Sequence, residues 1–358
     1  MQLARGIKDW LRGPDYGMWG RMNQFQYSAH SGTYPHEGDW YGKPTSGSQL
    51  WPWILQNSKL YAIPMCEADL LRKIAREIGD YVPENCPIID LGIGGEYAVR
   101  NKLAPIAKAV NAKRVVLVDG SSDFLNEAHQ AMRGLTSVAI TKVLDDFLSA
   151  ENAQYVDHAA LVTYTGSTVG NIDADQMASI PPMVELTEHL ERVLHKSHGG
   201  YALITFDSCL NESANKAAYE EHTPFHLNFI DQAVAECGFP ADVRWCMEYR
   251  ARPKTWYTNE KTRHPIAGAV SHYAEFTTDA SFEFAGEKFE ICKGQAFLIE
   301  NSFKYTEEFF SNCVEAADGQ VVASWTQGSI IGVLIKAASP MDEFVPVSSM
   351  LLRSAAGR

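Results

Sequence analysis

The sequence predicts a doubly wound α/β fold, in which helices cover both faces of a mostly parallel sheet, together with a second α+β domain. Two observations support this fold class. Short apolar segments alternate with helical segments over residues 87–206, which is the pattern of successive β-α-β units. Glycines or acidic residues follow several of the apolar segments, at the sheet edge where such folds bind their ligands.

Apolar runs and helical periodicity locate the elements of this sheet. Five strands are expected, at Pro87–Leu91, Arg114–Val118, Val138–Val143, Ala159–Tyr164 and Tyr201–Phe206. Helices are expected between them at 97–110, 122–133 and 182–196, and before them at 67–80, where apolar residues recur with helical spacing. Two later strands, Val321–Trp325 and Ile330–Ile335, would complete the sheet.

The middle of the chain has a different character. Residues 211–235 are helical and polar, and three segments after them alternate as antiparallel strands do, namely Ala269–Phe276, Phe282–Phe284 and Lys288–Cys292. Pro253 and Pro265 indicate an irregular connection before these strands. We therefore expect a ligand-binding core at 62–207 and 303–358, and a substrate-binding domain formed by 1–61 and 208–302.

Composition excludes several classes of protein. The net charge is −13 and no Lys/Arg cluster is present, which disfavours a nucleic-acid partner. The seven cysteines form no CxxC pair, so we expect neither a metal site nor a disulfide framework. No apolar run is long enough to span a membrane and charges interrupt the first twelve residues, so a cytoplasmic protein without a membrane partner is expected. The oligomeric state is not specified.

The residues at the strand ends predict a nucleoside site. Gly92 and Gly94 follow the first strand and would let the backbone approach a ligand closely. Asp119 ends the second strand, where its carboxylate can accept both ribose hydroxyls. Asp146 and Phe147 follow the third, where an acid can accept from an adenine amino group and an aromatic ring can cover the base.

The glycine turn favours S-adenosylmethionine over a dinucleotide. A dinucleotide fingerprint has a third glycine where this chain has Tyr97, and the turn carries Glu96 rather than a basic residue. Pyrophosphate would be poorly received there, whereas S-adenosylmethionine has no phosphate and carries a positive sulfonium. Two alternatives remain: a nicotinamide-dependent oxidoreductase on the same type of sheet, and a non-catalytic scaffold, which would need neither the acids nor the glycines.

Two motifs resemble one enzyme family. Residues 166–171 read Gly-Ser-Thr-Val-Gly-Asn and residues 300–305 read Glu-Asn-Ser-Phe-Lys-Tyr. They are similar to the GSTxGN and ExSxK[YF] motifs of the histidine-specific S-adenosylmethionine-dependent methyltransferases, whose members include the enzyme that makes the trimethylhistidine precursor of ergothioneine. Fungal N-methyltransferases acting on tryptophan derivatives belong to the same broad family. Weaker matches complete the resemblance, which spans roughly 40–340: Trp40-Tyr41, Gly47–Leu50, Tyr61–Glu67, Asp207, Ala218-Tyr219, Phe225 and Asn228.

The resemblance implies a Rossmann-like methyltransferase sheet and an N-methyltransferase that acts on a small amino acid or amine. It implies that Gly166 belongs to the cofactor site. It also implies that Asn171 and Tyr219 hold the carboxylate and amino group of the acceptor, while Tyr61 points at the amine that receives the methyl group. Tyr61 and Asn171 are therefore the expected catalytic residues.

The same resemblance assigns the rest of the acceptor pocket. Glu300 and Ser302 would hold the polar end of the acceptor side chain, and Tyr41 would cover the pocket. Two positions depart from the family. Ala98 stands where the first loop usually has a lysine, and Ser271 stands where the pocket has a methionine. A smaller, more polar pocket floor at Ser271 leaves the acceptor open, so we expect a histidine-like or indole-like amino acid, N-methylated in secondary metabolism.

Each candidate residue also has a structural interpretation. Asn171 could cap a helix that begins near Asp173. Tyr219 could pack as part of an amphipathic helix, and Glu300 could be a surface acid of a strand. His272 could serve as a base, but a hydrogen-bonded structural histidine is the more common situation.

Overall fold

The computed structural model describes residues 2–13, 47–61, 63–145, 147, 154–171, 182–221, 223–259 and 261–338. Its main sheet has seven strands in the order β11-β12-β5-β4-β1-β2-β3. They are β1 (Ile88–Leu91), β2 (Arg114–Asp119), β3 (Ala139–Leu144), β4 (Leu161–Tyr164), β5 (Tyr201–Asp207), β11 (Gly319–Gln327) and β12 (Ile330–Ala337). Strands β1 to β5 pair in parallel, whereas β12 pairs antiparallel with both β5 and β11.

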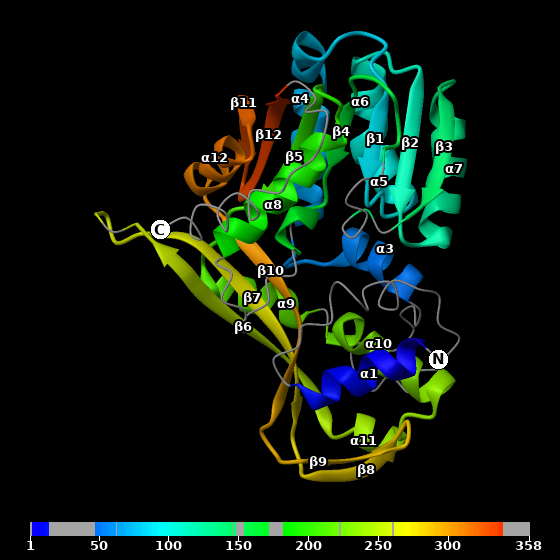
Figure 1. Cartoon of the computed structure of the whole chain (residues 1–358), viewed down its shortest axis with the longest axis vertical. Helices are drawn as coiled ribbons and strands as arrows, with labels where there is room; N and C mark the ends of the chain where they lie inside the picture. Colours follow the sequence, from blue (N-terminus) through cyan, green and yellow to red (C-terminus); the bar gives the residue numbers. More distant parts are fainter. Residues whose placement is uncertain are drawn as a thin grey trace, which may run out of the picture.

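Helices cover both faces of this sheet (Figure 1). They are α4 (Ile63–Tyr81), α5 (Glu96–Ala98), the π-helical turn η2 (Val99–Leu103), α6 (Ala104–Ala109), α7 (Ser122–Leu135), the short η3 (Thr168–Gly170), α8 (Pro182–His195) and α12 (Glu307–Ala316). Ile88 of β1 belongs to the buried apolar cluster that includes α4, α6 and α7, and its neighbour Ile89 belongs to the cluster that includes α8 and α12. Successive strand residues thus serve opposite layers, and the predicted doubly wound fold is confirmed.

A second sheet lies below the first in Figure 1. It has the order β10-β7-β6 and is antiparallel. Its strands are β6 (Met247–Thr258), β7 (Pro265–Phe276) and β10 (Ala296–Tyr305), and β8 (Ala280–Phe284) pairs with β9 (Glu287–Ile291) in a separate hairpin. The prediction of an irregular connection at Pro253 is wrong. The strand β6 runs through this residue, and it is an edge strand, where a missing N–H is tolerated.

Five of the helices in the described part of the chain accompany the second sheet. They are α1 (Gln2–Arg12), α3 (Gly47–Asn57), α9 (Glu212–Glu220), α10 (Thr223–Cys237) and α11 (Ala241–Arg244). None of the described helices is long and apolar enough to cross a membrane. The division of the chain into a core and a substrate-binding domain stays a prediction; its boundary at residue 302 would fall within β10.

Candidate active site

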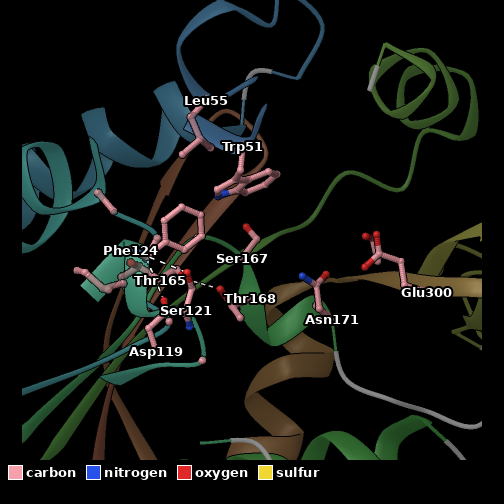
Figure 2. Close-up of a pocket in the computed structure, with 18 of the residues that line it drawn as sticks. Trp51, Leu55, Asp119, Ser121, Phe124, Thr165, Ser167, Thr168, Asn171 and Glu300 are labelled. Carbon is pink, nitrogen blue, oxygen red and sulfur yellow. Dashed lines mark hydrogen bonds between the residues drawn. The ribbon is translucent and has the colours of Figure 1, made fainter. Parts of the chain in front are cut away.

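A cavity of about 800 Å³ lies at the carboxyl ends of the parallel strands and continues to β10. It brings together most of the predicted site residues: Tyr61, Gly92, Gly94, Asp119, Phe147, Gly166, Asn171, Tyr219, Glu300 and Ser302. Figure 2 shows the cavity from Asp119 at one end to Glu300 at the other, with Ser167 and Asn171 between them. Tyr41 and Asp146 lie outside the described residues.

Glycine and a buried acid form the first end of the cavity. Gly92 has a φ of +73°, and a Cβ there would lie 3.4 Å from the ring of Phe147, so a side chain would fill the space between them. The Asp119 carboxylate accepts from the backbone N–H of Ser121 at 2.8 Å and of Gly94 at 3.3 Å. Burial raises the pKa of Asp119 to about 6.

Phe147 presents an aromatic surface next to this acid. Its ring meets Tyr164 edge-on at 5.7 Å, and the Tyr164 hydroxyl lies 3.0 Å from Nε2 of His189. Asp145 also lines the cavity and accepts from the Tyr155 hydroxyl at 2.9 Å. An aromatic face beside hydrogen-bond acceptors suits a purine ring and a ribose.

A buried ion pair that the sequence did not predict lies behind the glycines. Glu67 of α4 pairs with Lys102 of η2, and both line the cavity. Glu67 is fully buried and also accepts from the Thr205 hydroxyl and, at 2.5 Å, from the Gly166 N–H. Lys102 lies four residues after Ala98, on the same helical face, and this spacing was the available signal.

Glu67 also steadies a strained turn. Gly166 has a φ of +83° and Ser167, which is not a glycine, has a φ of +54°. The left-handed conformation costs free energy for a residue with a Cβ and recurs at functional sites. Ser167 lines the cavity with a buried hydroxyl that has no hydrogen-bond partner among the described residues, as expected for a group that binds a ligand.

Two tyrosines and a buried ion pair form the middle of the cavity. Lys304 donates to the Tyr219 hydroxyl at 2.7 Å and lies 3.2 Å from Oδ2 of Asp207. The ring of Tyr61 meets Tyr219 edge-on at 5.5 Å. Burial raises the pKa of both tyrosines above the ordinary value of 10, so both hydroxyls are neutral at physiological pH.

The far end of the cavity is a hydrogen-bonded cluster around Glu300. This side chain is only 5% exposed, so it is not a surface acid. Its Oε1 lies 3.1 Å from Nδ1 of His226. The His226 ring stacks on Tyr249 at 4.4 Å and on His272 at 4.5 Å, which fixes its orientation.

His272 completes this cluster as a structural histidine. The Tyr249 hydroxyl lies 2.6 Å from Nδ1 of His272. Nε2 of the same ring lies 3.0 Å from Ser302 Oγ. His226, His272 and Glu300 offer ligand atoms within 4.8 Å of one another, but these hydrogen bonds already engage both nitrogens of His272.

The structure corrects the placement of Ser271. In the ladder between β7 and β10, His272 pairs with Glu300 and Ser271 pairs with Asn301. Side chains alternate between the two faces of a strand, so Ser271 points away from the face that carries Glu300. It is absent from the described cavity wall, and the smaller pocket floor expected at this residue is not found there.

Comparison with known proteins identifies the family. The model of the family described as "Histidine-specific methyltransferase, SAM-dependent" matches residues 40–334. The chain belongs to this family. The N-methyltransferase dtpB of Aspergillus flavus is 22% identical over 286 residues, 76% of each chain. The uncharacterized protein y4iF of Sinorhizobium fredii is 27% identical over 285 residues, 75% of this chain and 90% of that protein.

The solved structures that the comparison matched include a riboflavin-derivative dimethyltransferase, RosA, from Streptomyces davawensis. It shares 14% identity at a TM-score of 0.36, with 76% of this chain and 54% of that chain covered. A putative S-adenosylmethionine-dependent methyltransferase from Listeria monocytogenes shares 13% identity at a TM-score of 0.31, with 75% and 98% covered.

The family confirms the predicted enzyme class and cofactor, a methyltransferase that uses S-adenosylmethionine, in place of the nicotinamide-dependent oxidoreductase alternative. The residues present fit this cofactor. Gly92, Asp119 and Phe147 line one end of the cavity, which is large enough for a nucleoside and a second small molecule.

Proposed function

We propose that this methyltransferase modifies the amino nitrogen of a small amino acid or related amine, with a histidine-like or indole-like side chain. The observation that supports this proposal is the single cavity that joins the Asp119 end to the polar groups Tyr61, Asn171, Tyr219 and Glu300. A nucleoside cofactor and an amino acid can therefore occupy neighbouring positions.

The cofactor end supplies complementary groups for each part of S-adenosylmethionine. We assign the ribose to Asp119, the adenine to Phe147, and close backbone approach to Gly92, Gly94 and Gly166. The cation of Lys102, 5% exposed in the cavity wall, would pair with the carboxylate of the methionine part. The bound cofactor supplies a methyl group already activated by its sulfonium.

The middle of the cavity would hold the amino-acid head of the acceptor. Neutral hydroxyls on Tyr61 and Tyr219 and the amide of Asn171 can donate to a carboxylate and accept from a neutral amine. The amine must lose its proton before it attacks, and groups of this kind orient it without acting as strong bases. Their main contribution would be alignment and exclusion of water.

The far end would select the side chain. Glu300 already meets His226 through one oxygen, which leaves the other for an N–H donor of the acceptor. An unpaired buried carboxylate is costly, so an acceptor with a nitrogenous side chain should bind better than an apolar one. A place in secondary metabolism, a cytoplasmic location and the lack of a nucleic-acid partner remain predictions from the sequence.

A screen of amino acids with S-adenosylmethionine tests this proposal, with products read as mass increments of one, two or three methyl groups. For the best acceptor, Glu300→Ala should raise KM by about tenfold or more, the effect of losing a charge-assisted hydrogen bond. KM for phenylalanine should change little. Glu290→Ala, at an exposed acid of β9, is the control. An unchanged KM in Glu300→Ala, or an acceptor that lacks an amine, would contradict the proposal.

A further inference from the structure

The helix α1 lies outside residues 40–334, the part of the chain that matches the family, yet it forms part of the cavity wall. Arg5, Gly6 and Asp9 of this helix line the same cavity as Glu300 and Asn171. Figure 1 shows α1 beside α10, on the side of the molecule away from the parallel sheet. Because α1 and the acceptor residues Glu300 and Asn171 line the same cavity, we assign the wall that α1 provides to the acceptor end.

The opposite stripe of α1 anchors it firmly. Four apolar residues of the helix are buried, namely Leu3, Ile7, Trp10 and Leu11. The indole N–H of Trp10 donates to the Leu298 carbonyl at 2.7 Å, and its ring meets Phe229 edge-on at 5.3 Å. Leu298 precedes Glu300 by two residues in the same strand, so α1 is docked on the element that carries the side-chain subsite.

Gly6 is the unusual residue on the cavity side of α1. A glycine inside a helix is less favourable than alanine by roughly 0.5–1 kcal/mol. Gly6 lines the cavity with backbone atoms alone, so a larger residue at this position would change the cavity wall. Arg5 and Asp9 flank it, with Nε and Oδ2 3.9 Å apart. Asp9 also accepts from Nη1 of Arg12 at 3.1 Å through its other oxygen, which leaves Arg5 as the less engaged charge on this side of the helix.

We infer that α1 sets the size of the acceptor, and that Gly6 makes room for an amino acid whose side chain extends beyond a single unsubstituted ring system. The polar far end of that side chain would lie against Arg5 and Asp9. The cavity volume, about 800 Å³, lies towards the upper part of the usual range for small-molecule sites. The inference rests on the proposed N-methylation of an amino acid.

The test compares one acceptor with a larger analogue of it, tryptophan with 5-benzyloxytryptophan, in wild type and in the series Gly6→Ala, Gly6→Leu and Gly6→Phe. Wild type should methylate both. The ratio of kcat/KM for the large acceptor to that for the small one should fall stepwise, by about tenfold or more in Gly6→Phe. Affinity for S-adenosylhomocysteine, measured by calorimetry, should stay within about twofold, because the cofactor end lies elsewhere.

Lys8→Phe is the matched control, since it adds the same ring on the same helix at a residue absent from the described cavity wall; it should leave the ratio unchanged. A ratio that stays constant along the Gly6 series, an equal loss for both acceptors, or rejection of the larger acceptor by wild type would each overturn the inference. If wild type binds S-adenosylhomocysteine but methylates no amino acid, the proposed function itself fails and the inference fails with it.

Discussion

The two ends of the cavity are built in different ways. At the cofactor end, Gly92 and Gly94 lie in the loop after β1 and Asp119 ends β2. Backbone N–H groups satisfy the Asp119 carboxylate. At the acceptor end, polar groups that are far apart in the sequence satisfy one another, as in Lys304 with Asp207. The free energy of unfolding should therefore depend more on the Lys304–Asp207 pair at the acceptor end than on Asp119 at the cofactor end.

Removal of Lys304 is the strongest test of this difference. Lys304→Met leaves the Asp207 carboxylate, which is 2% exposed, without its cation. An uncompensated buried charge costs about 3–5 kcal/mol, so the free energy of unfolding in urea should fall by that amount. The double variant Lys304→Met/Asp207→Asn should recover much of the loss. Equal stability of the single variant and wild type would show that the ion pair does not hold this end together.

The matching change at the cofactor end is Asp119→Ala, which should affect binding rather than folding. Loss of charge-assisted hydrogen bonds should weaken S-adenosylhomocysteine binding by about 1.5–3 kcal/mol in calorimetry. The free energy of unfolding should change little, because the ionised Asp119 is disfavoured by burial. Asp80→Ala, at an exposed residue of α4, is the control. Unaltered affinity in Asp119→Ala would remove this residue from the cofactor site.

The same difference decides what could be predicted from the sequence. The strands β1, β2 and β4 are apolar runs because both faces of a parallel sheet are covered, and their loops contain the cofactor residues in chain order. His226 escaped prediction because its partner Glu300 is 74 residues away, so no local pattern marks the contact. Ser271 was predicted to line the pocket, but it lies one residue from His272, which pairs with Glu300, and adjacent residues of a strand point to opposite faces.

The π-helical turn at the cofactor end was also not predicted from the sequence. Helical periodicity predicted one regular helix over 97–110, but the chain forms α5, η2 and α6 in succession. Such turns are rare and frequently occur at functional sites. In this chain the turn contains Lys102, which pairs with Glu67. The helix was therefore predictable from the sequence, but the ion pair in its irregular turn was not.

The smallest expected effect is a pH dependence confined to the cofactor end. Burial raises the pKa of Asp119 from its ordinary value of 3.8 to about 6, and only the ionised carboxylate can accept from both ribose hydroxyls. Between pH 7 and pH 5 the ionised fraction falls about tenfold, so S-adenosylhomocysteine affinity should fall by a similar factor. Asp119→Asn should show a flat profile over this range, even though Asp90, whose pKa burial raises to about 7, can still titrate.

Folding should respond to Asp119 in the opposite direction, and this sign separates the two effects. A carboxyl group whose pKa is raised in the folded state contributes stability below its ordinary pKa, and this contribution is lost as the pH rises from 3.8 through about 6. Acidification from pH 7 to pH 5 should thus favour the fold at Asp119 while it weakens binding. Two results together would place the titrating group in contact with the ligand. The affinity for S-adenosylhomocysteine should fall at pH 5 in wild type but not in Asp119→Asn, and the Tm of wild type at pH 5 should stay level with that of the variant or rise relative to it. A pH profile shared by the two proteins would instead assign the dependence to another group and leave the ribose without its proposed acceptor.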